Sequence, residues 1–178
     1  MGINTHDEQL LKRLTVAITE KPRANTKEIA EASGISRATF NRFCGSRDNL
    51  VTMIVKQAEE SLREINAIAM EDTTDYISTV KRLLDAHINN QEYLVFLCSI
   101  QNSMENQIWD EYLKALDTFF LNGQKQGVFR LDLTAQMISE LFVAMICGAI
   151  DANRRGRVAN VGIKDSMALF FLNGTVVK

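Results

Sequence analysis

The sequence is poor in the residues that interrupt helices or cross-link chains. Its 178 residues include one proline, Pro22, and nine glycines. Because an internal proline costs a helix about 3 kcal/mol, this scarcity favours long helices. The three cysteines, Cys44, Cys98 and Cys147, are odd in number and widely spaced, which is typical of a reducing cytoplasm and not of a disulfide scaffold.

The chain also lacks the patterns of membrane, metal-binding and catalytic proteins. Its first ten residues are polar, and its longest apolar run, residues 141–150, falls short of the roughly 20 residues that cross a bilayer. Two histidines and no cysteine pair offer no zinc site. No P-loop, GxSxG, HExxH or dinucleotide fingerprint occurs. We therefore predict a cytoplasmic protein that is not an enzyme, with no catalytic residues, no metal, no cofactor and no membrane partner.

Positive and negative side chains nearly balance over the whole chain, but they are unevenly distributed along it. The formal net charge is −2 at pH 7. Residues 21–47 carry six basic and two acidic side chains, hence +4, whereas residues 56–178 carry twelve basic and sixteen acidic side chains, hence −4. A basic segment within an otherwise acidic chain is typical of a protein that binds the phosphate backbone of a nucleic acid through that segment.

Apolar residues recur at the helical period along almost the whole chain. A first helix is expected around residues 10–18, before Pro22, and a long fourth helix from Ser46 or Arg47 to about residue 65. Later helices are expected near residues 75–89, 91–102, 106–126, 134–154 and 162–176. No alternating pattern of useful length predicts a β-strand. The sequence predicts an all-α fold of about nine helices.

Between the first and fourth helices, the sequence predicts two short helices joined by a tight turn. Asn25 followed by Glu28 has the form of a capping box that opens the second helix. Gly34 tolerates the positive φ of a sharp turn, and Ser36 is a good N-cap for a third helix that ends near Phe43. This arrangement is a helix-turn-helix in outline.

The third helix has a polar face suited to the major groove. If Ile35 and Phe40 pack inward, the residues left outside are Arg37, Ala38, Thr39, Asn41 and Arg42. Arginine can bind guanine edges or phosphates, asparagine can bind adenine, and a threonine methyl can contact thymine. The backbone amides at Ser36 and at Thr26 can bind phosphate. A plain helical hairpin is the alternative, but the cap, the turn and the local charge together favour DNA binding.

The same segment resembles the tetracycline-repressor (TetR) family. The resemblance lies in residues 25–40, in Arg42-Phe43 and in residues 45–50, and it covers roughly residues 8–55. Two positions depart from the family, which has aromatic residues where this chain has Asn41 and Cys44. The resemblance implies an N-terminal DNA-binding domain (residues 1–48) and a C-terminal helical effector-binding and dimerisation domain (residues 49–178). Together with the groove-facing side chains, it predicts these DNA contacts: Thr26, Lys27, Ser36, Arg37, Ala38, Thr39, Asn41, Arg42 and Arg47.

The last two helices are the best candidates for a dimer interface. One small helix-turn-helix reads few base pairs, so we expect a homodimer that places two recognition helices ~34–36 Å apart on a palindromic site of double-stranded DNA. Residues 141–150 are apolar on all sides of a helix, as they would be between a core and a partner. The alternative is a core within one chain. The predicted interface comprises Ala144, Gly148, Ala152, Met167, Phe170, Phe171 and Val177.

The resemblance also implies a small-molecule effector pocket among the middle helices. Aromatic and methionine side chains at helical spacing serve equally well as core. The candidate lining residues are His87, Phe96, Gln101, Met104, Trp109, Tyr112, Phe119, Met137 and Phe142. The hypothesis is a transcriptional repressor released from its operator by the effector. The alternative is a DNA-binding protein of the same fold that acts without an effector, in nucleoid organisation or through a protein partner.

Overall fold

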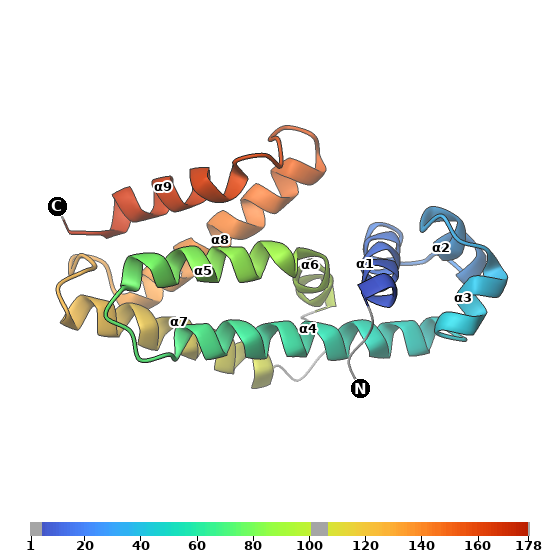
Figure 1. Cartoon of the computed structure of the whole chain (residues 1–178), viewed down its shortest axis with the longest axis horizontal. Coiled ribbons are helices and arrows are strands. Elements are labelled where there is room, and N and C mark those ends of the chain that lie inside the picture. The colour runs from blue at the N-terminus through green and yellow to red at the C-terminus, as the bar shows by residue number, and fades with distance from the viewer. Residues whose placement is uncertain (1–4, 101–106, 178) are drawn as a thin grey trace. The chain divides into compact units, whose positions relative to one another are not determined.

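The computed structural model describes residues 5–100 and 107–177, and within these ranges the chain is all-α (Figure 1). Apart from one isolated antiparallel bridge between Phe129 and Val176, the described residues are helices and their connections. The predicted fold class is confirmed. The helices are α1 (Thr5–Glu20), α2 (Thr26–Ala32), α3 (Arg37–Phe43), α4 (Arg47–Ala69), α5 (Tyr76–Asn89), α6 (Gln91–Ile100), α7 (Gln107–Lys125), α8 (Ala135–Arg154) and α9 (Ile163–Thr175).

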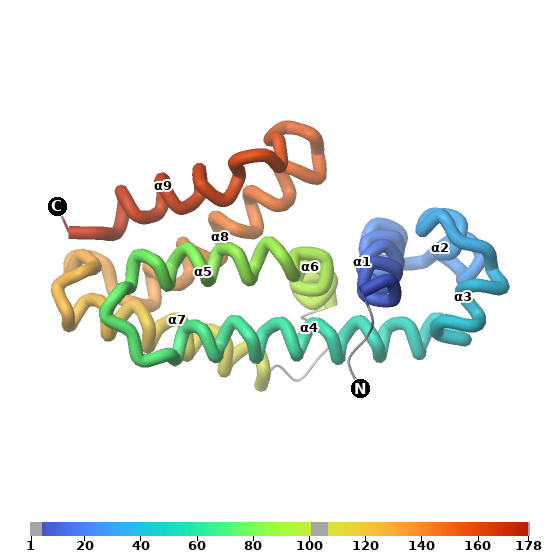
Figure 2. The backbone as a smooth tube through the Cα atoms, in the orientation of Figure 1, coloured from blue at the N-terminus to red at the C-terminus, as the bar shows by residue number. Residues whose placement is uncertain are grey.

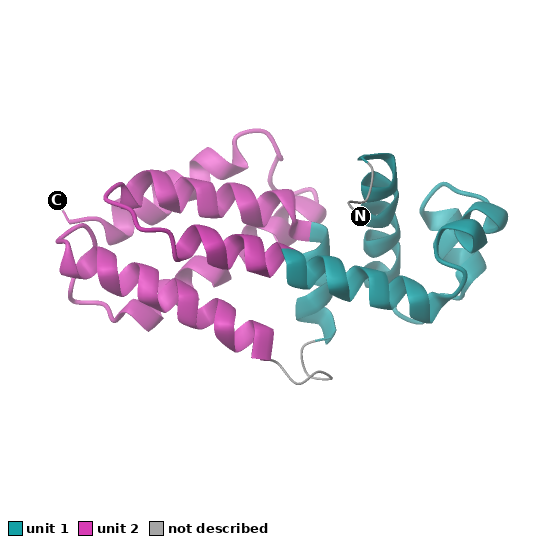
Figure 3. Cartoon of the chain, turned by 60° about the horizontal axis from the view of Figure 1, so that its bottom comes forward, with its two compact units in different colours: residues 1–60, 92–105 teal, residues 61–91, 106–178 magenta. Residues whose placement is uncertain are grey.

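The chain divides into two compact units, which Figure 3 colours separately. Unit 1 comprises residues 1–60 and 92–105, and unit 2 comprises residues 61–91 and 106–178. The helix α4 therefore contributes its first part to unit 1 and its last part to unit 2. Nearly all of α6 belongs to unit 1, although the helix follows α5 of unit 2 directly in the chain.

Unit 1 buries one apolar face of each of its N-terminal helices. In α1 the buried residues include Leu11 and Leu14, which recur at the spacing of a helix face. The helix α2 contacts both α1 and α3, and its Ile29 is fully buried. Phe40 of α3 and Leu50 of α4 are also fully buried. These side chains form the core that holds the two short helices in place.

Unit 2 is built on aromatic packing. In this unit α7 contacts α8, α5 contacts α8 and α9, and α8 contacts α9. The tube in Figure 2 follows the chain from α8 through a loop and back along α9. Adjacent ring centroids lie 5.0–6.0 Å apart, within the range of favourable edge-to-face and tilted pairs. The rings belong to Tyr76, Phe119, Phe120, Phe129, Phe142 and Phe171.

The helix α8 departs in one respect from the sequence prediction. By length and composition alone, Ala135–Arg154 is apolar enough to cross a membrane, and a third of its most apolar window is buried. The sequence prediction that no segment is long enough to cross a bilayer considered only the continuous apolar run of residues 141–150. Core helices of water-soluble proteins have the same composition when one face meets the core. Here Phe142, Ile146 and Ile150 supply that buried face.

Candidate nucleic-acid interface

The second helix of the motif begins at a fully formed capping box. The Asn25 side-chain oxygen accepts hydrogen bonds from the backbone N–H groups of Lys27 at 3.0 Å and Glu28 at 3.1 Å. The Glu28 carboxylate in turn accepts from the Asn25 backbone N–H at 2.8 Å. Because α2 is only seven residues long, these bonds satisfy a large share of its otherwise unpaired amides. The predicted cap is confirmed.

The turn between α2 and α3 depends on Gly34. This residue has φ +69°, a conformation that costs other residues about 1–2 kcal/mol. Its N–H donates to the Glu31 carbonyl at 3.1 Å, and the next N–H, of Ile35, donates to the Ala30 carbonyl at 3.0 Å. These two bonds close α2 and direct the chain into α3. The predicted glycine turn is confirmed.

Caps and one buried ring fix the orientation of α3. The Ser36 hydroxyl accepts from the Thr39 N–H at 3.1 Å and lies 3.0 Å from the Thr39 hydroxyl. Phe40 is fully buried, so the face of α3 that carries it is turned inward. Cys44 ends the helix, and burial raises the pKa of its thiol to about 11. That thiol is therefore neutral near pH 7 and a weak nucleophile.

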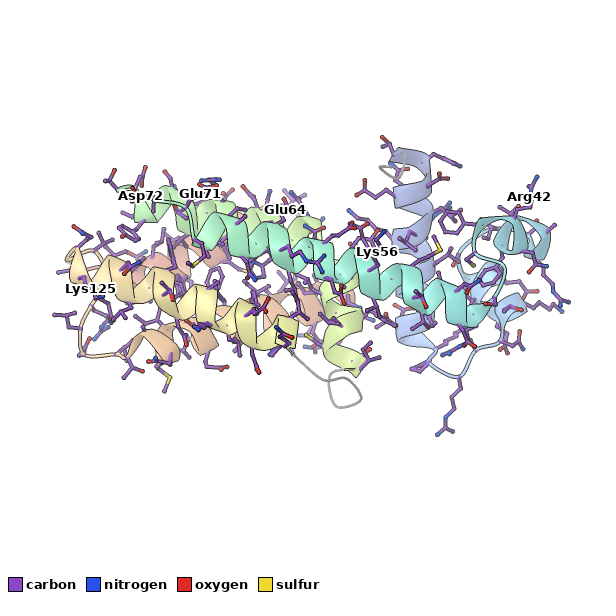
Figure 4. The ribbon with its side chains drawn as sticks, turned by 90° about the horizontal axis from the view of Figure 1, so that it is seen from below. Arg42, Lys56, Glu64, Glu71, Asp72 and Lys125 are labelled. Atoms are coloured by element: carbon purple, nitrogen blue, oxygen red, sulfur yellow. The ribbon has the colours of Figure 1, made fainter. Side chains whose placement is uncertain are left out.

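The opposite face of α3 is polar and exposed. Arg37, Ala38, Asn41 and Arg42 are all exposed, and Thr39 is half-buried beside Ser36. Figure 4 labels Arg42, whose side chain projects outward from α3. The spacing of residues 37, 38, 41 and 42 places them on one side of a helix. The structure thus presents the predicted groove-facing residues together on a single short helix.

The α2 residues predicted as phosphate contacts lie at the start of that helix. Lys27 is exposed and forms a loose ion pair with Glu31, with 3.9 Å between the ammonium nitrogen and the carboxylate oxygen. Such exposed pairs contribute little to stability and are easily exchanged for another anion. Thr26 is half-buried in the first turn.

Arg47 is held in a way that the sequence did not predict. Its guanidinium Nη2 donates to the carbonyl oxygen of Pro22 at 2.7 Å, which joins the first residue of α4 to the turn between α1 and α2. The same turn forms a hollow of about 450 Å³ that is lined by Lys21, Pro22, Arg23, Ala24 and Glu28. Lys21 and Arg23 were counted in the local basic charge but were not predicted as site residues.

Four of the predicted effector residues come together in unit 2. His87 and Tyr112 are buried, with 2.8 Å between His87 Nε2 and the Tyr112 hydroxyl. The His87 ring lies edge-on to the Phe142 ring, with 5.5 Å between their centroids. The centroids of the Tyr112 and Trp109 rings lie 5.2 Å apart. His87 Nδ1 lies 2.6 Å from the Leu83 carbonyl, which can only accept. His87 therefore carries its proton on Nδ1 and accepts from Tyr112, and burial lowers its pKa to about 4.

The other predicted effector residues are dispersed. Phe119 belongs to the aromatic core of unit 2 and contacts Phe120. Phe96 is buried in unit 1. Met137 is 49% exposed on α8, so it does not join the buried cluster. Gln101 and Met104 lie outside the described residues.

The predicted dimer residues divide into an exposed and a buried set. Ala144, Gly148, Phe170 and Val177 are exposed, and Ala152 is half-buried. Apart from the nearby backbone of α8 itself, a methyl group added at Gly148 would meet no atom of the described residues within 4 Å. Met167 and Phe171, at 4% exposure each, belong to the core of unit 2. An apolar groove of about 970 Å³ runs between α8 and α9, with Leu141, Leu169 and Phe170 among its lining residues.

The three cysteines differ in exposure, with only Cys44 buried. Cys98 and Cys147 are exposed, although their neighbours in the sequence are mostly apolar. On an amphipathic helix, apolar neighbours along the chain do not share one face, which explains this exposure. Among the residues described, no group of three histidine, cysteine, aspartate or glutamate side chains could hold a metal ion.

Comparisons with known proteins agree with this geometry. No family model matches the chain. The chain is 42% identical over 180 residues to the HTH-type transcriptional regulator NfxB of Pseudomonas aeruginosa, covering 98% of this chain and 96% of NfxB. Its fold is similar to that of the TetR-family regulator PfmR of Thermus thermophilus (TM-score 0.66, 19% identity, 95% of each chain). It is also similar to the ketosteroid regulator KstR2 of Mycobacterium tuberculosis (TM-score 0.75, 14% identity, 99% and 98% of the two chains).

The relative that resembles this chain along nearly its whole length is named a helix-turn-helix transcriptional regulator. The structural neighbours share the all-α fold and include regulators of the TetR type. In this chain, the capped helix α2, the Gly34 turn and the exposed polar face of α3 form the corresponding motif. The chain belongs to the same family of helix-turn-helix transcriptional regulators as NfxB, and its fold is that of TetR-family regulators.

Proposed function

We propose that this regulator is a sequence-specific DNA-binding repressor of the cytoplasm that a small-molecule effector releases from its operator. The observation that carries the DNA-binding part is the division of α3 into two faces: Phe40 is fully buried, whereas Arg37, Asn41 and Arg42 are exposed. A short helix anchored on one side and polar on the other fits the major groove. The proposed contacts are Thr26, Lys27, Ser36, Arg37, Ala38, Thr39, Asn41 and Arg42.

The test is selection of bound sequences from random duplex DNA, followed by titration of the enriched site. We expect a palindromic site, because two copies of the motif related by a two-fold axis read the same sequence twice. Arg42→Ala should weaken binding to that site by roughly 1–3 kcal/mol and relax the preference at one base pair of each half-site. Lys56→Ala is the matched control, since Lys56 is an exposed cation of α4 outside the motif (Figure 4).

A selection that enriches no DNA sequence would contradict this assignment, and so would an Arg42→Ala variant that binds the site as tightly as the parent chain. A loss of affinity in Lys56→Ala equal to that in Arg42→Ala would show that only general basic charge matters.

We place the dimer interface on the exposed faces of α8 and α9. Phe170 and Leu169 are 75% and 67% exposed, and Leu141 on α8 is 48% exposed. Together with Ala144 and Gly148 they form an apolar surface of a kind that marks an interaction site. A second copy of the chain is the expected occupant, because DNA reading by this motif needs two copies.

Phe170→Glu tests this interface by placing a charge at its centre. We expect the variant to sediment as a folded monomer and to lose operator affinity, because the two recognition helices are no longer linked. Met70→Glu serves as the control, since Met70 is a 60% exposed apolar residue that directly follows α4. A Phe170→Glu variant that remains dimeric would move the interface elsewhere.

The buried polar pair of His87 and Tyr112 supports an effector site in unit 2. A neutral imidazole and a phenol set among Phe142 and Trp109 provide hydrogen-bonding groups in an apolar environment. Sites for small molecules combine apolar walls with a few such groups. We therefore expect a largely apolar effector with a hydrogen-bonding group.

The helices α4 and α6 supply the proposed coupling. The helix α4 is divided between the two compact units, and α6 begins at their boundary, with only Gln91 in unit 2. A rearrangement in unit 2 therefore changes the constraint on unit 1 through the backbone itself. An effector acts only if its affinity differs between the operator-bound and released conformations. The functional boundary is proposed near residue 48, between the DNA-binding segment 1–48 and the effector and dimerisation segment 49–178.

A screen of apolar compounds tests the effector, with fluorescence of Trp109, the one tryptophan of the chain, as the readout. A true effector should change this fluorescence and dissociate the operator at the same concentration. Tyr112→Phe should weaken its binding, whereas Tyr76→Phe, in another part of unit 2, should not. A regulator that acts through a protein partner or in nucleoid organisation would give no such compound from the screen.

A further inference from the structure

The turn between α1 and α2 carries basic side chains that the helix-turn-helix does not account for. Lys21 and Arg23 are exposed on either side of Pro22. Within the described part of the chain, neither forms an ion pair, whereas Lys12 of α1 and Lys27 of α2 each pair with a glutamate. Two neighbouring cations that form no ion pair make this turn locally electropositive.

The turn has a defined backbone geometry. The Lys21 N–H donates to the Ala17 carbonyl at 3.1 Å, and the Ala24 N–H donates to the Lys21 carbonyl at 2.9 Å. Pro22 restricts its own φ, as is favoured at the second position of a turn. Ala24 is 8% exposed, so the turn is anchored in the core of unit 1. The side chains of residues 21 and 23 therefore leave a rigid backbone.

Arg47 fixes the turn from outside. Its hydrogen bond of 2.7 Å to the Pro22 carbonyl joins residues 25 positions apart. The bond uses one of the five N–H donors of the guanidinium, and it keeps a third cation beside Lys21 and Arg23. The only acidic residue lining the hollow is Glu28, whose carboxylate already accepts a hydrogen bond from the Asn25 N–H at 2.8 Å.

We propose that Lys21 and Arg23 form a backbone clamp that binds a DNA phosphate beside the recognition helix, and that Arg47 is the positioning residue that holds the clamp. This inference rests on the proposed DNA-binding function. The occupant follows from charge complementarity and from continuity: residue 23 lies two positions before the Asn25 cap of α2, and α2 contacts α3. The hollow of about 450 Å³ accommodates a phosphodiester group.

A phosphate clamp has a signature that base contacts lack. Each phosphate neutralised contributes about 0.9 to the slope of log K against log salt concentration for B-form DNA. Removing a clamp residue should therefore lower the slope by about one, and it should weaken binding to any duplex to the same extent. A contact to a base edge would instead change the preference for one sequence.

The experiment measures binding of the full chain to a random-sequence duplex of about 30 base pairs between 50 and 200 mM salt. We expect Arg23→Gln to lower the slope by about one, with Lys21→Gln acting in the same direction. Lys56→Gln is the matched control and should leave the slope unchanged. Lys56 lies nine residues after Arg47 on α4, about 13 Å along the helix and on its opposite side.

The role of Arg47 is tested in two backgrounds. If it acts through the turn, Arg47→Gln lowers the slope in the parent chain but adds nothing to Lys21→Gln/Arg23→Gln. A further decrease of about one in that double variant would show that Arg47 binds phosphate itself and would overturn its positioning role. An unchanged slope in Arg23→Gln would overturn the clamp. If the parent chain binds no duplex at all, the proposed function fails, and this inference fails with it.

Discussion

Units 1 and 2 stabilise their helices by different interactions. In unit 1, α2 and α3 have seven residues each, well below the roughly 12–15 residues at which an isolated helix becomes marginally stable. They depend on caps formed within three residues of each helix start. In unit 2, α7 and α8 have 19 and 20 residues and depend on aromatic packing between residues far apart in the chain. Short-range bonds thus shape the proposed DNA-binding surface, and long-range packing shapes the other unit.

The largest expected effect comes from Phe40, the buried ring that anchors α3 in unit 1. Phe40→Ala should lower the free energy of unfolding by about 3–5 kcal/mol. Removing a fully buried phenylalanine ring leaves a cavity that the short helices around it cannot close. Hydrogen exchange of the α3 amides should accelerate, and DNA binding should be lost. Leu131→Ala, at a 78% exposed position, should change the unfolding free energy by less than about 0.5 kcal/mol.

The second prediction concerns the buried histidine of unit 2. Its folded pKa, about 4, lies below the ordinary value of 6.5. The unfolded chain therefore binds the proton more tightly, so the stabilisation is complete above pH 6.5 and is lost as pH falls toward 4. The loss attributable to His87 is about 3 kcal/mol by the usual conversion of a pKa difference. Urea denaturation across this pH range measures it.

His6 provides the matched control for that titration, because it is the other histidine of the chain and is exposed. His87→Gln should show a smaller decline in stability between pH 6.5 and 4, whereas His6→Gln should follow the parent chain. Equal profiles for all three proteins would mean that carboxylates alone set the acid sensitivity.

Two glycines sharpen the comparison between the units. By helix propensity, Gly123→Ala in α7 should stabilise the protein by about 1 kcal/mol. However, a Cβ at Gly123 would lie 2.3 Å from Cδ2 of Phe129, a ring held between Tyr76, Phe119 and Phe120. We therefore expect a net loss of about 1–3 kcal/mol from overpacking. Trp109 fluorescence during denaturation reports on this unit.

Gly34→Ala should also destabilise the protein, but through backbone strain and not through a steric clash. Among the described residues other than its chain neighbours, the nearest atom to its added Cβ is the flexible guanidinium of Arg13, at 3.9 Å. The cost of about 1–2 kcal/mol arises only from the positive φ of the backbone. A stabilising effect at either glycine would show that the local backbone relaxes more readily than this structure indicates.

The sequence predicted the parts of the molecule that local signals determine. The Asn25–Glu28 cap, the Ser36 cap and the Gly34 turn each involve residues at most five apart, and all three occur as predicted. The hydrogen bond from Arg47 to Pro22 joins residues 25 positions apart, and no short pattern indicates it. The exposed face of α3 could be predicted because one buried residue, Phe40, fixes the rotation of a short helix, and its contact with DNA stays a prediction.

Long-range packing explains where the prediction was less accurate. On α8, apolar residues occur on every face, so periodicity could not show that Phe142 is buried while Met137 and Cys147 are exposed. For the same reason, Met167 and Phe171 could not be distinguished from Phe170 on α9. The sequence pattern identifies which residues are apolar, but contacts between helices decide which of them remain available to a partner or a ligand.

The smallest expected effect concerns two tyrosines, one in each unit. Tyr93 of α6 is fully buried, and its hydroxyl has no hydrogen-bond partner among the residues that the structure describes. Burial raises its pKa, with Glu8 and Glu92 adding to the effect. Tyr112 is also buried, but its hydroxyl donates to His87. A buried hydroxyl without a partner costs free energy, whereas a satisfied one stabilises by about 1 kcal/mol.

The same substitution should therefore have opposite signs at the two positions. Tyr93→Phe should raise the unfolding free energy by about 1 kcal/mol, because it removes a desolvated hydroxyl and keeps the ring on which the Lys12 ammonium lies, 6.0 Å from the centroid. Tyr112→Phe should lower the unfolding free energy, because it leaves His87 Nε2 without its donor. Paired urea denaturation curves measure both changes. If both variants lose stability equally, the Tyr93 hydroxyl has a partner in solution, and the contrast between the two units does not extend to their buried polar groups.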